Sequence, residues 1–513
     1  MYLTQGLHRS VQQTPRETMT ICGERTRTFA EVADRVARLA GGLQGLGVGS
    51  GDRVGILALN SDRYHEYLLA VPWADAVLTP VNIRWSPAEV AYALEDSGTS
   101  VLFVDDLFAA ALPAIRDRYD GLRTVVHLGD GPTPEGTLSY ESLVADAAPV
   151  PDARRGGDQL AGIFYTGGTT GLPKGVMLSH ANMVSQNLGF MASRAFLGPG
   201  TRFLHAAPMF HLADLAGWGG QVLLGGTHVM VPAFDPAAVA AAIEEHGVTD
   251  VLLVPTMIQM LVDHPAAKER DLGCLERVVY GASTIAEALL RRAMDTLPST
   301  SFVQGYGMTE LAAVATILGA EEHRAGGPLL RSAGRAAPHV ELRIVDDAGR
   351  EVPPGVVGEV TVAGPNVMLG YWNRPEETAA ALRDGWMHTG DVGHVDEEGY
   401  LYIVDRLKDM IVSGGENVYS AEVENAVASH PSVAACAVVG VPDDAWGERV
   451  HAVVVCKPGA TLTLDELRRH VRSLIASYKT PQGLEIVEAL PISAAGKVLK
   501  RELRDRHRAE GEA

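Results

Sequence analysis

Apolar residues along the first 160 positions alternate between helical and strand spacing. A Thr28–Glu31 capping box opens a stretch with apolar residues three and four positions apart, which predicts a helix. The apolar run 54–59 predicts a buried strand, and Ser86-Pro87 begins a second helix with proline in its first turn. Further strands are predicted at 101–104, 229–230, 251–254 and 277–280. This alternation predicts layered α/β structure with largely parallel sheets.

The pattern changes after about residue 335. Short apolar runs at 342–345 and 358–362 are separated by Asp346-Asp347 and by Pro353-Pro354-Gly355, which are turn signals. We expect a β-rich subdomain over about 335–400, within a large N-terminal domain of residues 1–405.

Residues beyond Asp405–Lys408 return to a mixed pattern. Apolar spacing predicts a helix at 421–429, and a Thr463–Glu466 capping box leads an apolar helical face that reaches Ile475. The remaining expected elements are strands at 433–439, 450–456 and 484–487 and a basic helix from Val498. We therefore expect a small α+β C-terminal domain of residues 406–513.

Charge and composition argue against nucleic-acid binding and against a membrane-spanning segment. The formal net charge is −20, so the phosphate backbone of nucleic acid would repel the protein. The N-terminus lacks a basic segment followed by an apolar one, and no apolar run is long enough for a transmembrane segment. The four cysteines lie far apart, which favours neither a metal cluster nor a disulfide framework. We expect a cytoplasmic globular protein, with a homodimer left open as its assembly.

A loop rich in glycine and threonine stands at Tyr165–Gly175. Its backbone N–H groups, its hydroxyls and the Lys174 ammonium suit a polyphosphate. It is not a P-loop, because two residues separate Gly171 from Lys174 and no Ser or Thr follows the lysine to hold Mg²⁺. Taken alone, the stretch is either a phosphate cradle or a surface loop.

Four further segments carry polar residues suited to nucleotide binding. Gln304–Glu310 offers glycines for close approach, a tyrosine face and a carboxylate for Mg²⁺, or else it is a turn beside a helix start. Trp386–Asp391 ends in a carboxylate that accepts from ribose hydroxyls, although Gly-Asp is commonly a turn. Asp405–Asn417 and Pro491–Lys497 place charges beside glycines or small residues, or are solvated turns.

In type, order and spacing, these five segments resemble the adenylate-forming superfamily of acyl-CoA synthetases, coumarate-type CoA ligases, luciferases and peptide-synthetase adenylation domains. The resemblance covers nearly the whole chain. The runs Pro365–Trp372 and Asp405–Ile411 look most like bacterial fatty-acid or aryl-acid CoA ligases. The resemblance implies an ATP-dependent acid–CoA ligase: a carboxylate attacks MgATP to give acyl-AMP and pyrophosphate, and CoA then displaces AMP. A non-catalytic nucleotide-binding module is disfavoured, since all the matched charged residues are in place.

The resemblance also implies roles for individual residues. Thr309 is expected at the α-phosphate, Glu310 at Mg²⁺, and Lys497 between the carboxylate and the α-phosphate during adenylation. The residues expected around the β- and γ-phosphates are Thr166, Gly167, Gly168, Thr169, Thr170 and Lys174. Those expected around the nucleoside are Gly281, Ala282, Ser283, Gly305, Tyr306 and Gly307 at adenine, and Asp391 and Arg406 at the ribose.

The same resemblance implies a function for the division into two domains. It implies that the C-terminal domain rotates about a hinge at Lys408 between the half-reactions. Lys497 serves adenylation, and Gly414 and Gly415 then line the path of the thiol, where side chains would block pantetheine.

The acid is left open by the motifs. In relatives the acyl pocket is built around the segments that match His211 and the residues after Gly281 and Glu310, so His211 is a candidate catalytic residue; a lone histidine is otherwise usually a core residue. If residues 211–218 are helical, His211 and Asp214 share one face. Asp214 then either orients His211 or bonds to backbone outside the pocket.

The acceptor is open as well. Thr480–Gly483 and Ile492 stand where many relatives carry basic residues that favour CoA. The alternatives are an enzyme that activates another oxyacid, such as a nitrite-activating diazotase, and an amide or carrier-protein ligase.

Overall fold

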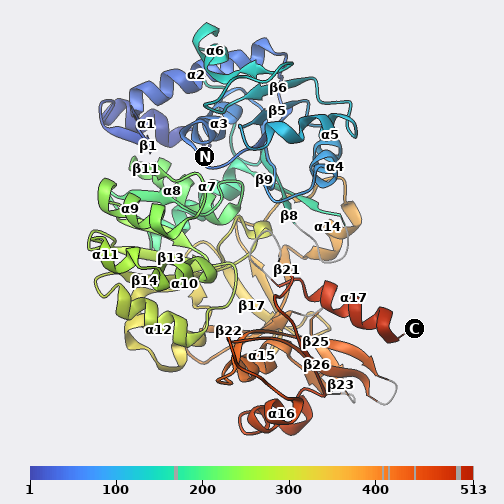
Figure 1. Ribbon diagram of the computed structural model, residues 1–513. Helices are drawn as coiled ribbons and strands as arrows, with labels where there is room; N and C mark the ends of the chain where they lie inside the picture. The colour runs from blue at the N-terminus through green and yellow to red at the C-terminus, as the bar shows by residue number, and fades with distance from the viewer. Residues whose placement is uncertain (167–171, 407–408, 414–415, 444–445, 493–497, 512–513) are drawn as a thin grey trace. The chain divides into compact units, whose positions relative to one another are not determined.

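The computed structural model describes residues 1–166, 172–406, 409–413, 416–443, 446–492 and 498–511 (Figure 1). Contacts within the chain define two compact units. The first consists of Met1–Leu342 with Val362–Met387, and the second of Arg343–Thr361 with His388–Ala513. Each unit has a hydrophobic core of its own.

A nine-stranded sheet runs through the first unit in the order β16-β15-β14-β13-β12-β10-β11-β1-β2. Pairing is parallel from β14 to β1 and antiparallel at both ends. The strands are β1 (Thr18–Cys22), β2 (Arg25–Thr28), β10 (Arg202–His205), β11 (Thr227–Met230), β12 (Asp250–Leu253), β13 (Arg277–Gly281), β14 (Ser301–Tyr306), β15 (Thr316–Leu318) and β16 (Arg335–Ala336). The parallel centre confirms the predicted α/β architecture and brings the carboxyl ends of β13 and β14 side by side.

The second sheet of the first unit has eight strands in the order β19-β9-β8-β4-β3-β5-β6-β7. The strands are β3 (Arg53–Leu57), β4 (Val77–Pro80), β5 (Val101–Val104), β6 (Thr124–His127), β7 (Leu138–Ser139), β8 (Leu160–Thr166), β9 (Lys174–Ser179) and β19 (Gly370–Tyr371). Only β9 pairs antiparallel, with β8 on one side and β19 on the other. The β8–β9 hairpin therefore contains the two described ends of the predicted phosphate loop, Tyr165–Thr166 and Lys174–Gly175.

Helices flank these strands, and α2 and α4 begin where the sequence predicts (Figure 1). The predicted Thr28–Glu31 capping box forms, and the structure shows a second capping box at Ser86–Glu89. The helices are α1 (Gln5–Gln13), α2 (Phe29–Gly45), α3 (Asp62–Trp73), α4 (Pro87–Ser97), α5 (Leu112–Arg116), α6 (Tyr140–Asp146), α7 (His180–Ala192), α8 (Leu212–Leu224), α9 (Pro236–His246), α10 (Pro255–Asp263), α11 (Ala266–Glu269), α12 (Glu287–Thr296), α13 (Ala320–Ala325) and α14 (Pro375–Ala381). Short 3₁₀ turns are η1 (Ala109–Ala111), η2 (Thr309–Leu311) and η3 (Gly327–Arg331).

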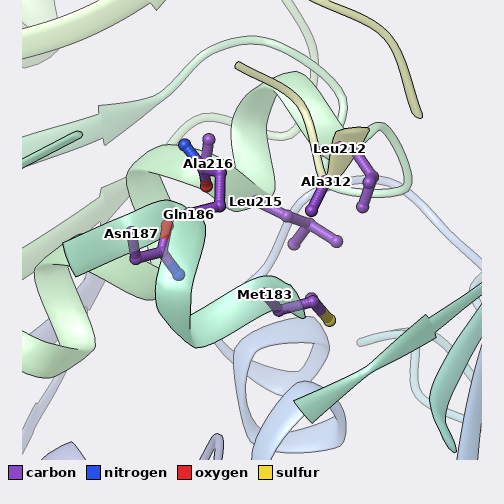
Figure 2. A pocket seen from close by; sticks show the side chains of 7 residues that line it. All are labelled: Met183, Gln186, Asn187, Leu212, Leu215, Ala216 and Ala312. Atoms are coloured by element: carbon purple, nitrogen blue, oxygen red, sulfur yellow. The ribbon is translucent and has the colours of Figure 1, made fainter. Parts of the chain in front are cut away.

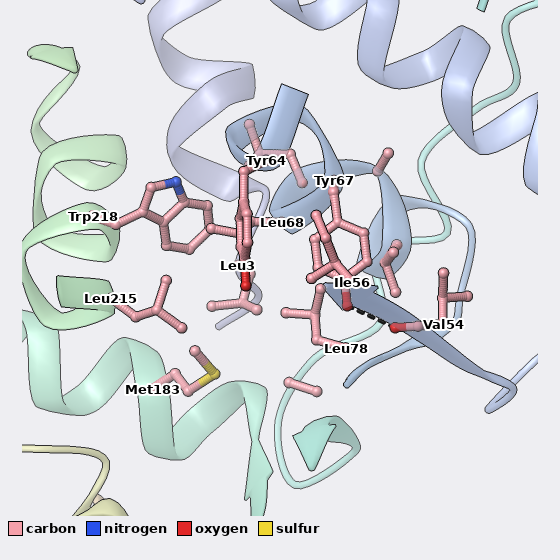
Figure 3. Packing of buried hydrophobic residues seen from close by; sticks show 14 of the residues in the cluster. Leu3, Val54, Ile56, Tyr64, Tyr67, Leu68, Leu78, Met183, Leu215 and Trp218 are labelled. Atoms are coloured by element: carbon pink, nitrogen blue, oxygen red, sulfur yellow. Dashed lines mark hydrogen bonds between the residues drawn. The ribbon is translucent and has the colours of Figure 1, made fainter. Parts of the chain in front are cut away.

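Helix α3 is buried on all sides in the main core of the first unit. Figure 3 shows Tyr64 and Leu68 of this helix against Trp218 of α8. The hydroxyl of Tyr67 donates to the Val54 carbonyl at 2.6 Å, which satisfies a buried polar group. Helix α8 is likewise buried over most of its length.

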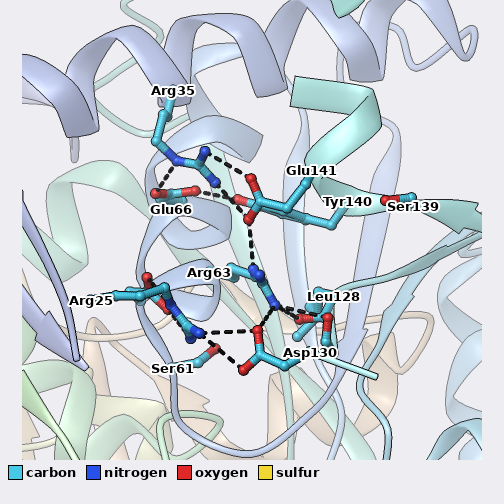
Figure 4. Close-up of polar contacts among 12 residues, drawn as sticks. Arg25, Arg35, Ser61, Arg63, Glu66, Leu128, Asp130, Ser139, Tyr140 and Glu141 are labelled. Carbon is cyan, nitrogen blue, oxygen red and sulfur yellow. Dashed lines mark hydrogen bonds and ion pairs between the residues drawn. The ribbon is translucent and has the colours of Figure 1, made fainter. Parts of the chain in front are cut away.

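Charged side chains around α3 form a network of ion pairs (Figure 4). Arg63 lies 2.9 Å from Asp130 and 2.8 Å from Glu141. Arg35 bonds Glu66 at 2.7 Å and Glu141 at 2.9 Å. These pairs join α2, α3 and α6 with the segment after β6, so they fix elements that are distant in sequence.

We expect the Asp62→Asn substitution to destabilise the first unit by ~3 kcal/mol, the lower end for breaking a buried ion pair. Asp62 is fully buried at the start of α3 and accepts both Nε and Nη2 of Arg25, at 3.0 and 2.9 Å. Urea unfolding measures the change. Asp34→Asn is the control, since its pair with Arg38 lies on the surface and contributes at most ~1 kcal/mol. Equal effects of the two variants would contradict the account.

The Asp62 carboxylate also makes the stability of the first unit depend on pH. Burial alone would raise the pKa of Asp62, but the guanidinium groups of Arg25 and Arg27 outweigh it and hold that pKa below its ordinary value. The stabilisation is therefore fully present above the unfolded-state pKa of ~3.9 and is lost as the pH falls through the lower folded value. The Asp62→Asn variant should lack this acid-dependent loss.

Two further sheets lie along the remaining chain. One contains β17 (Glu341–Val345), β18 (Gly358–Ala363), β20 (Leu382–Arg383), β21 (Trp386–Val395) and β22 (Leu401–Arg406). The other contains β23 (Ile411–Ser413), β24 (Glu416–Val418), β25 (Val433–Asp443), β26 (Gly447–Cys456) and β27 (Gly483–Ile486). The helical elements here are α15 (Ser420–Ala428), α16 (Leu464–Arg472), η4 (Ser477–Lys479) and α17 (Lys500–Gly511).

One helix is shorter than its apolar spacing predicts. The Thr463–Glu466 capping box forms, but α16 ends at Arg472, before Leu474 and Ile475. The N–H of Ser473 turns to the carbonyls of His470 and Val471, which closes the helix. Leu474 is consequently 55% exposed, so its place in the predicted apolar face is wrong.

Candidate functional site

The Gly/Thr-rich segment starts and ends on paired strands. Thr166 and Lys174 are partners in the β8–β9 register, and the Thr166 hydroxyl donates to the Lys174 carbonyl at 3.5 Å. Tyr165 is held by a 2.6 Å hydrogen bond from its hydroxyl to Asp96. Residues 167–171, with Gly167, Gly168, Thr169 and Thr170, lie outside the described residues. The hairpin thus places both ends of the loop at one point.

Lys174 and Glu310 are brought together by a third side chain, Tyr371. The Lys174 ammonium lies 5.1 Å from the centre of the Tyr371 ring. The Tyr371 hydroxyl donates to Glu310 Oε1 at 2.8 Å. Lys174 also forms an ion pair with Glu377. The structure therefore brings Lys174, predicted at the phosphates, near Glu310, predicted at Mg²⁺, although the two are far apart in sequence.

Tyr371 was not among the predicted site residues. Its only signal in the sequence is its place in the Pro365–Trp372 run, which contributed to the resemblance. Burial, and then the charge of Glu310, raise the pKa of Tyr371 far above its ordinary value. Its hydroxyl therefore stays protonated and remains a donor to the buried Glu310 carboxylate. Thr309 precedes this carboxylate in η2.

The predicted adenine residues stand at the carboxyl ends of two adjacent parallel strands. Gly281 of β13 and Gly305 of β14 are register partners. A Cβ at Gly281 would come within 2.3 Å of the Gly305 carbonyl oxygen, and one at Gly307 within 2.0 Å of the Ala313 oxygen. Tyr306 is the last residue of β14. In α/β sheets this edge is where ligands bind.

Strained backbone is concentrated at the same edge. Ala282, Ala312 and Ala313 have φ angles of 65°, 51° and 108°, in the region that favours glycine. Such residues each cost about 1–3 kcal/mol and persist where the surrounding structure holds them, commonly at functional sites. Ala282 precedes Ser283 in the predicted adenine segment, and Ala312 follows Glu310 by two positions.

A small pocket opens between α7, α8 and the segment after η2 (Figure 2). Its lining residues are Met183, Gln186, Asn187, Leu212, Leu215, Ala216 and Ala312. Most of these side chains are apolar. The Gln186 amide nitrogen and the Asn187 amide oxygen are buried without a hydrogen-bond partner among the described residues. The pocket is thus small and mostly apolar, with two buried amide atoms in the residues that line it.

His211 lies at the start of α8, the helix that supplies part of the pocket lining. It is the N-cap residue of α8, and its ring accepts the Ala213 N–H at 3.4 Å. The next residue, Leu212, lines the pocket. His211 itself is not among the residues that line the pocket, and its ring makes a capping contact instead.

Asp214 pairs with neither of the partners that the sequence suggested, the His211 ring and nearby backbone groups. It is fully buried, and its Oδ2 lies 2.6 Å from Nδ1 of His205 on β10. His205 in turn contacts His228 at 2.9 Å. The expected contact with His211 and the alternative of a backbone bond are both wrong, because this face of α8 points to the core.

The predicted ribose residues meet in the second unit. Asp391 and Arg406 are register partners in β21 and β22, with Arg406 Nε 3.2 Å from Asp391 Oδ1. The Thr389 hydroxyl accepts the Asp391 N–H at 3.1 Å, which holds this turn in place. The predicted residues Lys408, Gly414, Gly415 and Lys497 lie outside the described residues.

The AMP-binding enzyme family matches residues 7–372, and the AMP-binding enzyme C-terminal domain matches residues 422–497. The feruloyl-CoA synthase of an Amycolatopsis species is 43% identical over 506 residues, covering 97% of each chain. The fatty acid–[acyl-carrier-protein] ligase ScoC of Streptomyces coeruleorubidus is 38% identical over 506 residues, covering 96% of this chain and 94% of that protein. ATP-bound MatB from Rhodopseudomonas palustris has a TM-score of 0.89 at 31% identity, covering 99% of each chain.

The chain belongs to the AMP-binding enzyme family. It is an AMP-forming ligase, and the resemblance drawn from its motifs is confirmed. In the part of the chain that the structure describes, no helix is long and apolar enough to cross a membrane. The four cysteines, all of which are described, are free thiols.

Proposed function

We propose that this ligase joins a carboxylic acid to coenzyme A in two half-reactions. The acid's carboxylate oxygen attacks the α-phosphorus of ATP, which forms the acyl adenylate and releases pyrophosphate. The CoA sulfur, having lost its proton, then attacks the acyl carbonyl and expels AMP. ATP, Mg²⁺ and CoA are the cofactors and co-substrates. The observation that carries the proposal is the meeting of Lys174, Tyr371 and Glu310 beside the pocket residue Ala312.

The first half-reaction brings two anions together, so its main need is charge neutralisation. Lys174 exchanges its ion pair with Glu377 for the β- and γ-phosphates. Glu310 supplies a carboxylate oxygen, the kind of ligand that Mg²⁺ prefers, so the residues present fit this ion. Bound there, Mg²⁺ would neutralise phosphate charge. Tyr371 is a positioning residue, because its hydroxyl fixes the Glu310 carboxylate.

The remaining roles follow the predicted assignment. Thr309 contacts the α-phosphate, and Tyr306 with the Gly281–Ser283 segment encloses adenine. The close approach of Gly281 to Gly305 supports this, since side chains there would fill the space. Asp391 and Arg406 bind the ribose hydroxyls, supported by their pairing across β21 and β22.

The acid, in this proposal, is an aryl acid with a ring hydroxyl, of the hydroxycinnamate kind. The walls of the pocket are mostly apolar and include the buried Gln186 and Asn187 amides, a lining that matches an aromatic ring with a hydroxyl; the pocket is small and would have to widen to admit the ring. A relative named feruloyl-CoA synthase at 43% identity supports the same class.

We expect Gln186→Leu to lower kcat/KM for ferulate by ~10–100-fold, the scale of one lost buried hydrogen bond. Activity with unsubstituted cinnamate should be unchanged or higher, since no polar group is then left unpaired. The measurement is AMP release with each acid. Leu188→Asn on the exposed side of α7 is the control and should leave both acids unaffected. Equal losses with ferulate and cinnamate would rule out the pocket assignment.

A carrier protein is the main alternative to CoA as the acceptor of the acyl group. ScoC, at 38% identity, is named as a ligase to acyl carrier protein. Ile492 is 58% exposed where a basic residue would favour CoA. Thioester formation assayed with CoA and with a phosphopantetheinyl carrier protein distinguishes the two, and the proposal requires CoA to be used at least as well.

Domain movement belongs to the same proposal. Residues 406–513 rotate as a C-terminal domain about Lys408, away from the N-terminal domain of residues 1–405. Lys497 acts during adenylation, and Gly414 and Gly415 then line the thiol path. The free cysteines support a cytoplasmic location. A homodimer is the assembly proposed.

A further inference from the structure

Three side chains of the second unit gather at a place that the ligase reaction does not use. His451 lies on β26, Glu485 on β27 and His507 on α17, and one ligand atom from each lies within 4.8 Å of the others. His507 Nε2 is 3.1 Å from Glu485 Oε2, and the two imidazole ring centres are 4.2 Å apart. We call these three residues the His451 cluster. None of them belongs to a motif that carried the family resemblance.

His451 is the residue of this cluster whose surroundings indicate a missing ligand. It is 6% exposed, and neither ring nitrogen has a hydrogen-bond partner among the described residues. An imidazole always has a lone pair or an N–H to satisfy, and leaving such a group buried and unbonded costs about 1–3 kcal/mol. Buried polar groups of this kind point to a water or ion that completes the site.

The donor set identifies the kind of ion. Imidazole nitrogens with one carboxylate oxygen suit Zn²⁺ and related divalent transition metals, whereas Mg²⁺ and Ca²⁺ prefer oxygen alone. Three protein ligands leave a fourth position for water. Gly483 makes room for the ring, since a Cβ there would lie 2.2 Å from His451 Nδ1. Arg449, two positions before His451 on β26, adds a positive charge and weakens cation binding.

We propose that His451, Glu485 and His507 bind one Zn²⁺-type ion, which ties α17 to the β26–β27 edge of the sheet. Glu485 and His507 already form one side of the site, and a small shift of His451 completes it. The ion would secure α17, whose apolar contact with the sheet is made by Leu503. Helix α17 begins at Lys500, three positions after Lys497 in the sequence.

The test uses the full-length protein without a histidine tag, freed of metal with chelator. Calorimetric titration with ZnCl₂ should give one site per chain, and Zn²⁺ should raise the melting temperature. His507→Gln and Glu485→Gln should each weaken Zn²⁺ binding at least ~10-fold, the lower end even for groups that only support a ligand. Both variants keep a polar side chain of similar size, and circular dichroism checks that they fold.

The matched control is a second close pair of histidines in the same unit. His430 and His470 have ring centres 4.9 Å apart, and His470 bonds the Ser429 hydroxyl. His470→Gln should therefore leave Zn²⁺ binding unchanged. The proposal is overturned if the wild-type chain binds no stoichiometric Zn²⁺, or if His507→Gln binds it as well as the wild type. Either result would leave the ligase assignment untouched.

Discussion

The Lys497→Ala variant is expected to lose acyl-adenylate formation by at least ~10²-fold, the scale of removing one group that stabilises transition-state charge. Two anions meet in this step, the carboxylate of the acid and the α-phosphate of ATP. Lys497 is assigned to the position between them by its match to the family motif. Acid-dependent release of pyrophosphate measures the step.

The second half-reaction separates this role from a loss of folding. Lys497→Ala should still convert supplied acyl-AMP to the thioester, because CoA attack does not use this lysine. Lys457→Ala, which removes an exposed lysine from the same unit, should leave both steps near the wild-type rate. Near-normal pyrophosphate release by Lys497→Ala would remove the residue from its assigned role.

A second large effect is expected from Glu310→Gln. The substitution removes the negative charge from the proposed Mg²⁺ ligand, and metal-ion charge stabilisation contributes several kcal/mol to such reactions, so adenylation should fall by at least ~10²-fold. The Mg²⁺ concentration for half-maximal rate should rise as well. That shift marks a metal ligand, and Lys497→Ala should not show it.

Glu321→Gln is the matched control for this variant. Glu321 is exposed at the start of α13, in the same unit, and carries the same charge. It should leave both the rate and the Mg²⁺ requirement unchanged. If Glu310→Gln kept the wild-type Mg²⁺ requirement while losing activity, the carboxylate would have to act on something other than the ion.

Much of the fold follows from local signals. Capping boxes at Thr28, Ser86 and Thr463 mark the starts of α2, α4 and α16, because a hydroxyl and a glutamate three residues later satisfy free N–H groups wherever they occur. Strand β5 is predicted residue for residue, since a short apolar run between turns has few alternatives.

The parts of the site that depend on contacts between residues far apart in the sequence could not be predicted from local patterns. Tyr371 contacts Glu310 across 61 positions because β19 pairs with β9, and that pairing has no local signal. Asp214 meets His205 because α8 turns that face to the core, whereas spacing shows only that His211 and Asp214 are neighbours on a helix. The end of α16 was missed for a related reason, since Leu474 continues the apolar spacing without reaching the core.

Exchange of labelled pyrophosphate into ATP tests the central claim most directly. The account predicts exchange that needs Mg²⁺ and an added acid, is strongest with hydroxylated aryl acids, and proceeds without CoA. Added CoA should then give the acyl thioester with one AMP for each molecule formed. Release of ADP and phosphate in place of AMP and pyrophosphate, or exchange that no acid stimulates, would contradict the account.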